Sequence, residues 1–258
     1  MKAITKLGLS VLGCIAKLTG KKVNFSISDD KNSIAIPHTV WNTLLKKNVT
    51  KEGLVNYKGF INEKNRLIEY TSLLSNNPPS TNWTKDEQLA YWINAYNAFT
   101  VLLVINHYPI KSIKDIGGNI PKINSVWNIK FFKIGTVDFD LDTIEHEILR
   151  KQFEEPRIHF AINCASISCP RLRNEAYTAT KIEQQLEEQA VYFMTHPTYN
   201  KITAGHVHLS KIFDWFKSDF TKNQDIFQFL EKYVSVTFDD KVILEYFPYN
   251  WNLNELKN

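Results

Sequence analysis

The residues best suited to chemistry lie in one short segment, Arg157–Pro170, which carries His159, Cys164 and Cys169. An imidazole can serve as a general base and a thiolate as a nucleophile. The apolar run before Asn163 predicts a β-strand, and the loop after a strand is a common place for reactive side chains. The segment therefore predicts Cys164 as a catalytic nucleophile and His159 as its base.

A carboxylate is the third candidate catalytic group. A helix is predicted from Leu141 to about Phe153, and at 100° per residue Glu145 falls within its apolar face. An acid in a buried stripe must be paired or protonated. If the following strand folds back beside this helix, Glu145 comes level with His159 and would orient the imidazole. The alternative is a purely structural ion pair between helix and sheet.

The spacing of His159 and Cys164 leaves other arrangements open. Five residues of extended strand span roughly 16 Å and put the two side chains on opposite faces. A Cys–His pair then requires a bend after Ile162 or another histidine as the base; the other candidates are His146, His206 and His208. Alternatively, Cys164 is a structural residue or forms a disulfide with Cys169.

Zinc binding is a further alternative, because cysteine, histidine and carboxylate side chains are all zinc ligands. The residues concerned are Glu145, His146, His159, Cys164 and Cys169. The separation of the two cysteines differs from that in common zinc sites, so the leading interpretation assigns no metal ligand. The sequence contains no phosphate loop, dinucleotide fingerprint or Gly-x-Ser-x-Gly elbow, and we expect no cofactor.

A long helix is predicted to form one wall of the site. A capping box at Thr84–Glu87 opens a run to about Tyr108. Its length would suffice to cross a membrane, but its asparagines disfavour this, and a buried central helix fits better. Glu87, Asn94 and Asn97 form a polar stripe that could bind substrate, or the asparagines could hydrogen-bond to nearby backbone. Two candidate binding residues on the Leu141–Phe153 helix complete the set, His146 and Arg150.

The N-terminal residues resemble an export signal. Residues 1–22 contain five lysines and no acid, and an apolar stretch from Leu7 to Ala16 follows the first two lysines. The run Val11–Cys14 resembles a lipoprotein processing box in which Cys14 would be lipidated. The alternative is an amphipathic helix that lies on a membrane or on the domain. Export or membrane attachment through this tail and a cytoplasmic location therefore both stay open.

The remainder is expected to be one α+β domain over residues 36–258, after a tail and spacer over residues 1–35. Helices are predicted near 37–47, 60–74, 180–195, 210–220 and 225–234, hairpins near 129–139 and 201–209, and a strand at 242–247. Helices outweigh strands, which predicts a helix-rich fold with a small, mostly antiparallel sheet. Subtracting the five tail lysines from the 31 basic residues leaves 26 against 27 acidic residues. This balance disfavours nucleic-acid binding.

Four motifs occur in order along the chain. They run from Glu87 to Ala98, from Leu141 to Arg150, from Arg157 to Pro170 and from Tyr249 to Asn254. Together they resemble a widespread bacterial and plant family, domain of unknown function 547, over about residues 84–254. The resemblance implies no particular activity. A distant similarity to papain-like or transglutaminase-like cysteine enzymes is a further hypothesis for the fold.

These patterns lead to three hypotheses of function. The first is a Cys/His-dependent hydrolase or acyl transferase that acts on an amide, peptide or ester, with a small molecule or a peptide as substrate. The second is a non-enzymatic exported binding or scaffold module in which the same polar residues form a structural network. The third is a metal-binding protein.

Overall fold

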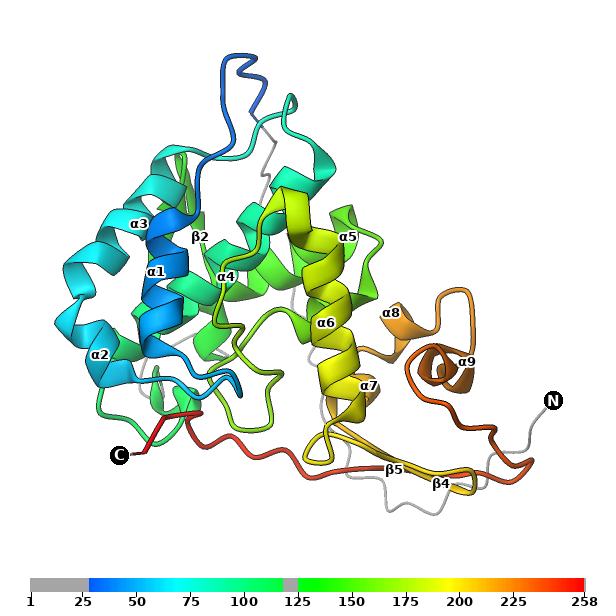
Figure 1. Ribbon diagram of the computed structural model, residues 1–258. Coiled ribbons are helices and arrows are strands. Elements are labelled where there is room, and N and C mark those ends of the chain that lie inside the picture. Colours follow the sequence, from blue (N-terminus) through cyan, green and yellow to red (C-terminus); the bar gives the residue numbers. More distant parts are fainter. Residues whose placement is uncertain (1–27, 118–124, 258) are drawn as a thin grey trace. The chain divides into compact units, whose positions relative to one another are not determined.

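The computed structural model describes residues 28–117 and 125–257 (Figure 1). The chain divides into two compact units, one of Ser26–Phe193 with Asn250–Asn258 and the other including Met194–Tyr249. Helices outweigh strands in the described residues and the two sheets are small, which confirms the predicted α+β class. The single domain over 36–258 stays a prediction. Most of the tail, with Cys14, lies outside the described residues.

Helices form most of the larger unit. α1 (Thr39–Asn48), α2 (Tyr57–Asn62) and α3 (Lys64–Asn76) precede the long α4 (Lys85–His107), which packs against α2 and α3. The rings of Trp41 and Tyr70 stack at 5.8 Å between α1 and α3. The helix expected near 60–74 is thus divided in two, because Glu63 leaves the helical region with ψ of 22°.

The prediction for α4 is confirmed. Thr84 accepts from the backbone N–H of Glu87, and the Glu87 carboxylate accepts from the backbone N–H of Thr84, so both bonds of the capping box are present. α4 is long and apolar enough to cross a membrane, but 89% of its most apolar window is buried inside the structure. It is therefore the core helix of the larger unit.

The segment after α4 contains short elements that lead to Glu145. They are η1 (Ile113–Asp115), η2 (Val126–Asn128), and the antiparallel hairpin β1 (Phe132–Ile134) and β2 (Val137–Phe139). Gly135 turns this hairpin with φ of +60°, as a tight turn requires. Asp140 then accepts from the backbone N–H of Thr143 at 2.7 Å and starts the next helix.

That helix is mostly a π-helix, η3 (Thr143–Leu149), followed by α5 (Arg150–Gln152). The N–H of Arg150 donates to the carbonyl of Glu145, five residues earlier, whereas an α-helix bonds four residues back. The helix was therefore predicted, but the angles of 100° per residue that placed Glu145 on the apolar face do not apply. The buried side chains of η3 are Thr143, Ile144, Ile148 and Leu149.

The prediction of a strand before Asn163 is wrong. Pro156–Phe160 is a 3-10 helix, η4. Proline suits the first helical position, and the Glu155 carboxylate accepts from the backbone N–H of Arg157 at 2.9 Å. The apolar run resembled a strand because its residues are buried, which helical and extended segments share. The distances that assumed an extended chain between His159 and Cys164 therefore do not apply.

The helix after the cysteine segment comprises η5 (Ala179–Lys181) and α6 (Ile182–Thr195). Two buried glutamines on α6 hold the flanks of the cysteine segment. Gln189 donates to the carbonyls of Phe160 and Arg171, each at 3.0 Å, and Gln185 donates to that of Ala176 at 2.9 Å. Buried amides must be bonded, so these contacts fix the path of the chain on both sides of Cys164.

The smaller unit contains a three-stranded sheet in the order β3-β4-β5. β3 (Lys201–Ile202) pairs antiparallel with β4 (His206–Leu209), which confirms the second hairpin, and β4 pairs parallel with β5 (Ile243–Tyr246). Three short helices join them: α7 (Ile212–Trp215), α8 (Lys217–Phe220) and α9 (Ile226–Glu231). His206 Nε2 pairs with Glu245 Oε2 at 2.8 Å on this sheet.

Candidate functional site

The two thiols of Cys164 and Cys169 lie side by side in the loop after η4. Both are thiols rather than halves of a disulfide, and their Sγ atoms are 2.8 Å apart. The backbone N–H of Cys164 donates to the Cys169 Sγ at 2.8 Å, and Ser166 Oγ lies 3.3 Å from the Cys164 Sγ. Cys164 is half-buried, whereas only 5% of Cys169 is exposed. Of the two cysteines, Cys164 is thus the more accessible to solvent.

Asn163 organises the turn that carries Cys164. Its Oδ1 accepts from the N–H of Ala165 at 2.9 Å, and its Nδ2 donates to the carbonyl of Pro170 at 2.7 Å. Ala165 has φ of +62°, in the left-handed region that alanine rarely adopts. Such a conformation costs roughly 1–2 kcal/mol and occurs mainly where the surrounding structure imposes it, commonly at functional sites.

The closing motif of the sequence pairs with this cysteine loop. Ile167 donates to the carbonyl of Asn252, and Asn254 donates to that of Ala165. The Asn254 Oδ1 in turn accepts from the Tyr57 hydroxyl at 2.6 Å. These bonds explain why two motifs far apart in sequence belong to one site, and they hold the loop firmly enough to keep Ala165 in its unusual conformation.

Glu145 lies close enough to Cys164 for a thiolate there to act on its carboxyl group. Its Oε2 accepts a hydrogen bond from the Tyr96 hydroxyl at 3.2 Å. Burial raises the pKa of Glu145, the negative charge of a Cys164 thiolate adds to the rise, and His146 opposes it. Burial also raises the pKa of Tyr96 well above its usual value, so its hydroxyl keeps the proton that it donates. The site therefore combines a half-buried thiol with a carboxyl group whose pKa is raised above that of an ordinary glutamate.

His159 is only 2% exposed and lies on η4, at the start of the segment that leads to Cys164. The interactions described for Glu145 involve Tyr96, His146 and Cys164. The predicted pairing of Glu145 with His159 stays a prediction, as does the role of His159 as a base.

His146 and Arg150 form a chain along η3 and α5. An Arg150 guanidinium nitrogen lies 2.8 Å from His146 Nδ1, and His146 Nε2 lies 3.6 Å from Asp142. A guanidinium only donates, so Nδ1 is the acceptor in the contact with Arg150. Burial raises the pKa of Asp142, and His146 opposes that rise. The binding role of His146 and Arg150 stays a prediction.

The three polar residues of α4 do different things. Asn94 bonds through both ends of its amide to the backbone of Tyr177, at 2.8 and 3.0 Å. Asn97 donates to the carbonyl of Ala161 at 3.0 Å and accepts from the N–H of Asn163 at 2.8 Å. These contacts favour the interpretation that the asparagines bond loop backbone. Of the two, Asn97 acts directly on the turn that carries Cys164.

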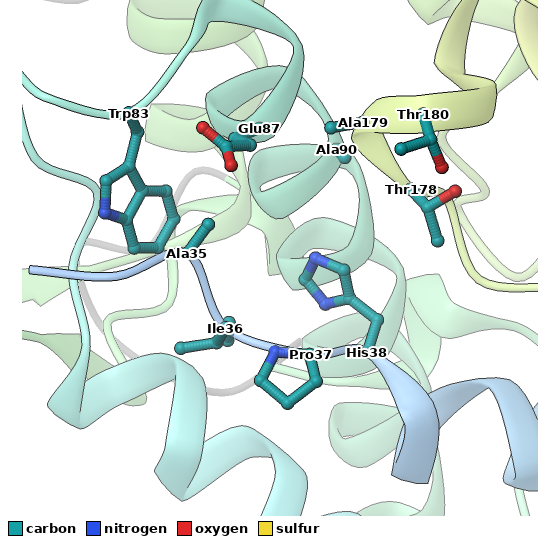
Figure 2. A pocket seen from close by; sticks show the side chains of 10 residues that line it. All are labelled: Ala35, Ile36, Pro37, His38, Trp83, Glu87, Ala90, Thr178, Ala179 and Thr180. Atoms are coloured by element: carbon teal, nitrogen blue, oxygen red, sulfur yellow. The ribbon is translucent and has the colours of Figure 1, made fainter.

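The third polar residue of α4, Glu87, lines a separate pocket of about 250 Å³ in the larger unit. Figure 2 shows its carboxylate, the His38 ring and the Thr178 side chain around this hollow. Burial lowers the pKa of His38 to about 4, and its Nδ1 lies 2.8 Å from the Tyr70 hydroxyl. From Glu87 to Asn97 α4 rises about 15 Å, so the pocket and the cysteine loop lie at different levels of this helix.

Several residues of the site had no predicted role. They are Tyr57, Tyr96, Asn163, Ala165 and Asn254. Tyr96, Asn163, Ala165 and Asn254 stand inside the motifs noted from sequence, and that was the available signal. No group of three or more His, Cys, Asp or Glu side chains in the described residues is placed to hold a metal ion.

The comparisons with known proteins agree with the motifs. Residues 80–194 match a family described as protein of unknown function, DUF547, which confirms the resemblance over this segment. This stretch carries the first three motifs, from Glu87 to Pro170. The closing motif at 249–254 lies beyond it. No curated protein and no solved structure matches the chain.

Proposed function

We propose that this protein is a cysteine-dependent hydrolase or acyl transferase that acts on the carbonyl group of an ester, amide or peptide. The observation that carries the proposal is the placement of the half-buried Cys164 thiol near Glu145, a carboxyl group with a raised pKa. Enzymes tune carboxyl groups upwards in this way so that they can both accept and return a proton near neutral pH.

In the proposed reaction, Glu145 takes the proton of the Cys164 thiol, directly or through one water. The thiolate attacks the carbonyl carbon, and the resulting tetrahedral intermediate collapses to a thioester on Cys164. Glu145 returns the proton to the departing alcohol or amine. Water, or a second nucleophile in a transferase, then cleaves the thioester and restores the thiol.

The neighbouring groups support the thiolate. Ser166 Oγ lies 3.3 Å and Cys169 Sγ 2.8 Å from the Cys164 sulfur, and each can donate a hydrogen bond to it once it is negative. Tyr96 holds Glu145 by its hydroxyl. His159 is kept as the second candidate base, to be tested by substitution.

The test is acylation by an activated ester, followed by intact-mass measurement and by the rate of alcohol release. The chain has a third cysteine, so Cys14→Ser serves as the matched control. We expect an acyl group on Cys164 in the parent and in Cys14→Ser, and a loss of turnover on the order of a hundredfold or more in Cys164→Ser. Full turnover by Cys164→Ser would show that Cys164 is not the nucleophile.

Substitution of the base separates Glu145 from His159. If Glu145 is the base, acylation rises with pH as its carboxyl group loses the proton, over a range above that of an ordinary glutamate, and Glu145→Gln abolishes this rise. If the rise persists in Glu145→Gln and disappears in His159→Gln, the histidine is the base. The scaffold alternative predicts no acylation of any variant.

A further inference from the structure

The loop from Cys164 to Cys169 has a geometry that suits a second reaction of the same sulfur. The two Sγ atoms are 2.8 Å apart, and a disulfide bond requires about 2.0 Å. A shift of less than about 1 Å would therefore bring the sulfurs to bonding distance. The anchors of the loop are hydrogen bonds from Asn163 and to residues 250–254, so both sulfurs are held close together before any reaction.

The two thiols differ in exposure, and this fixes the order of events. Cys164 is half-buried, whereas Cys169 is 5% exposed. An oxidant from solution therefore meets Cys164 first. Cys169 is prepared to attack next, because the N–H of Cys164 donates to its sulfur at 2.8 Å and would stabilise a thiolate there.

We propose that Cys164 and Cys169 form a thiol–disulfide exchange site for small disulfides, in which Cys164 reacts first, as the nucleophile, and Cys169 resolves the mixed disulfide. The Cys164 thiolate attacks one sulfur of the small disulfide and releases one thiol. Cys169 then attacks the Cys164 sulfur, and the second thiol leaves with the proton of Cys169. Two protein thiols are oxidised and one small disulfide is reduced to two thiols, so electrons and atoms balance.

The consequence concerns the proposed enzyme. A sulfur within a disulfide is not a thiolate and cannot attack a carbonyl carbon. Oxidation therefore switches the acylation reaction off, and reduction by a dithiol restores it. This control of acylation by oxidation rests on the proposed function. The exchange reaction itself does not, since it requires only the two sulfurs and their different exposure.

The experiment uses full-length Cys14→Ser protein, treated with bis(2-hydroxyethyl) disulfide and analysed by intact mass and peptide mapping. We expect the loss of two hydrogens, no retained adduct, and a Cys164–Cys169 cross-link. Cys169→Ser should retain the mixed disulfide on Cys164 on the order of tenfold longer or more. Cys164→Ser should leave Cys169 unmodified, because it is buried. Circular dichroism and thermal unfolding establish that each variant is folded.

A stable adduct on Cys164 in the parent protein would overturn the proposal, as would modification of Cys169 in Cys164→Ser at the parent rate. Activity is measured separately. If the cross-link forms but no ester acylates the protein, the exchange site stands and the hydrolase proposal fails. If Cys164 is acylated but never cross-linked, the reverse holds.

Discussion

The Tyr96 hydroxyl donates to the Glu145 Oε2 at 3.2 Å and joins the core helix α4 to the π-helix η3. A π-helical turn is rare and occurs frequently at functional sites, since it shifts side chains away from their α-helical positions. Here it accompanies a carboxyl group near the Cys164 thiol, and burial raises the pKa of that carboxyl. Tyr96 and Glu145 therefore connect the buried core with the candidate site.

The raised pKa of Glu145 predicts a pH dependence of stability. Between the usual carboxyl range and its raised pKa, folded Glu145 keeps a proton that the unfolded chain has lost. Stability therefore falls as pH rises through this window, by up to about 1.4 kcal/mol per pH unit. We expect Glu145→Gln to lack this fall, as measured by urea unfolding of both proteins at several pH values. Glu147→Gln on the same helix controls for the loss of one carboxylate, and an equal pH profile in all three proteins would contradict the prediction.

Asn97 and Asn94 offer a matched pair of substitutions. Each buries an amide that bonds two backbone groups, and leaving such groups unsatisfied costs about 1–3 kcal/mol apiece. Both Asn97→Ala and Asn94→Ala should therefore lower the free energy of unfolding by several kcal/mol. Only Asn97 holds the Asn163 turn, so only Asn97→Ala should change the rate at which iodoacetamide alkylates Cys164. Equal alkylation rates in the two variants would show that Asn97 does not position the thiol.

The left-handed conformation of Ala165 predicts that a smaller and a larger side chain at this position affect stability differently. Glycine adopts a φ of +62° without penalty, so Ala165→Gly should leave the unfolding free energy within about 1 kcal/mol of its original value. A β-branched side chain is far less compatible, and Ala165→Val should destabilise the protein by roughly 2 kcal/mol or more. Chemical denaturation measures both. If valine is tolerated as well as glycine, the left-handed conformation is not required.

The lowered pKa of His38, in the pocket lined by Glu87, predicts that the stability of the protein is sensitive to acid. Its pKa is lowered by burial from 6.5 to about 4, so the unfolded chain takes up a proton in this range before the folded protein does. Stability should fall as pH drops through that window, by up to about 3 kcal/mol from this residue. His38→Gln keeps a partner for the Tyr70 hydroxyl but does not titrate. The unfolding free energies of the two proteins should therefore converge or cross on acidification, and a constant difference would exclude the effect.

Helix starts and turns could be predicted from the sequence where a single local interaction or residue type determines them. The capping box at Thr84 specified the start of α4, and Gly135 specified the turn between β1 and β2. The segment before Cys164 could not be read in this way. Its apolar residues are buried in a 3-10 helix, and burial alone does not distinguish a helical turn from a strand.

The sequence by itself determined which residues are candidates for the site: Cys164, Glu145 and the asparagines of α4 all stand in its motifs. Only the tertiary structure decided how they meet, because the contacts that build the site join segments far apart in the chain. Tyr96 reaches Glu145 across 49 positions, and Asn254 reaches Asn163 across 91. Such pairings depend on the summed packing of the whole unit, which no local pattern of residue types contains.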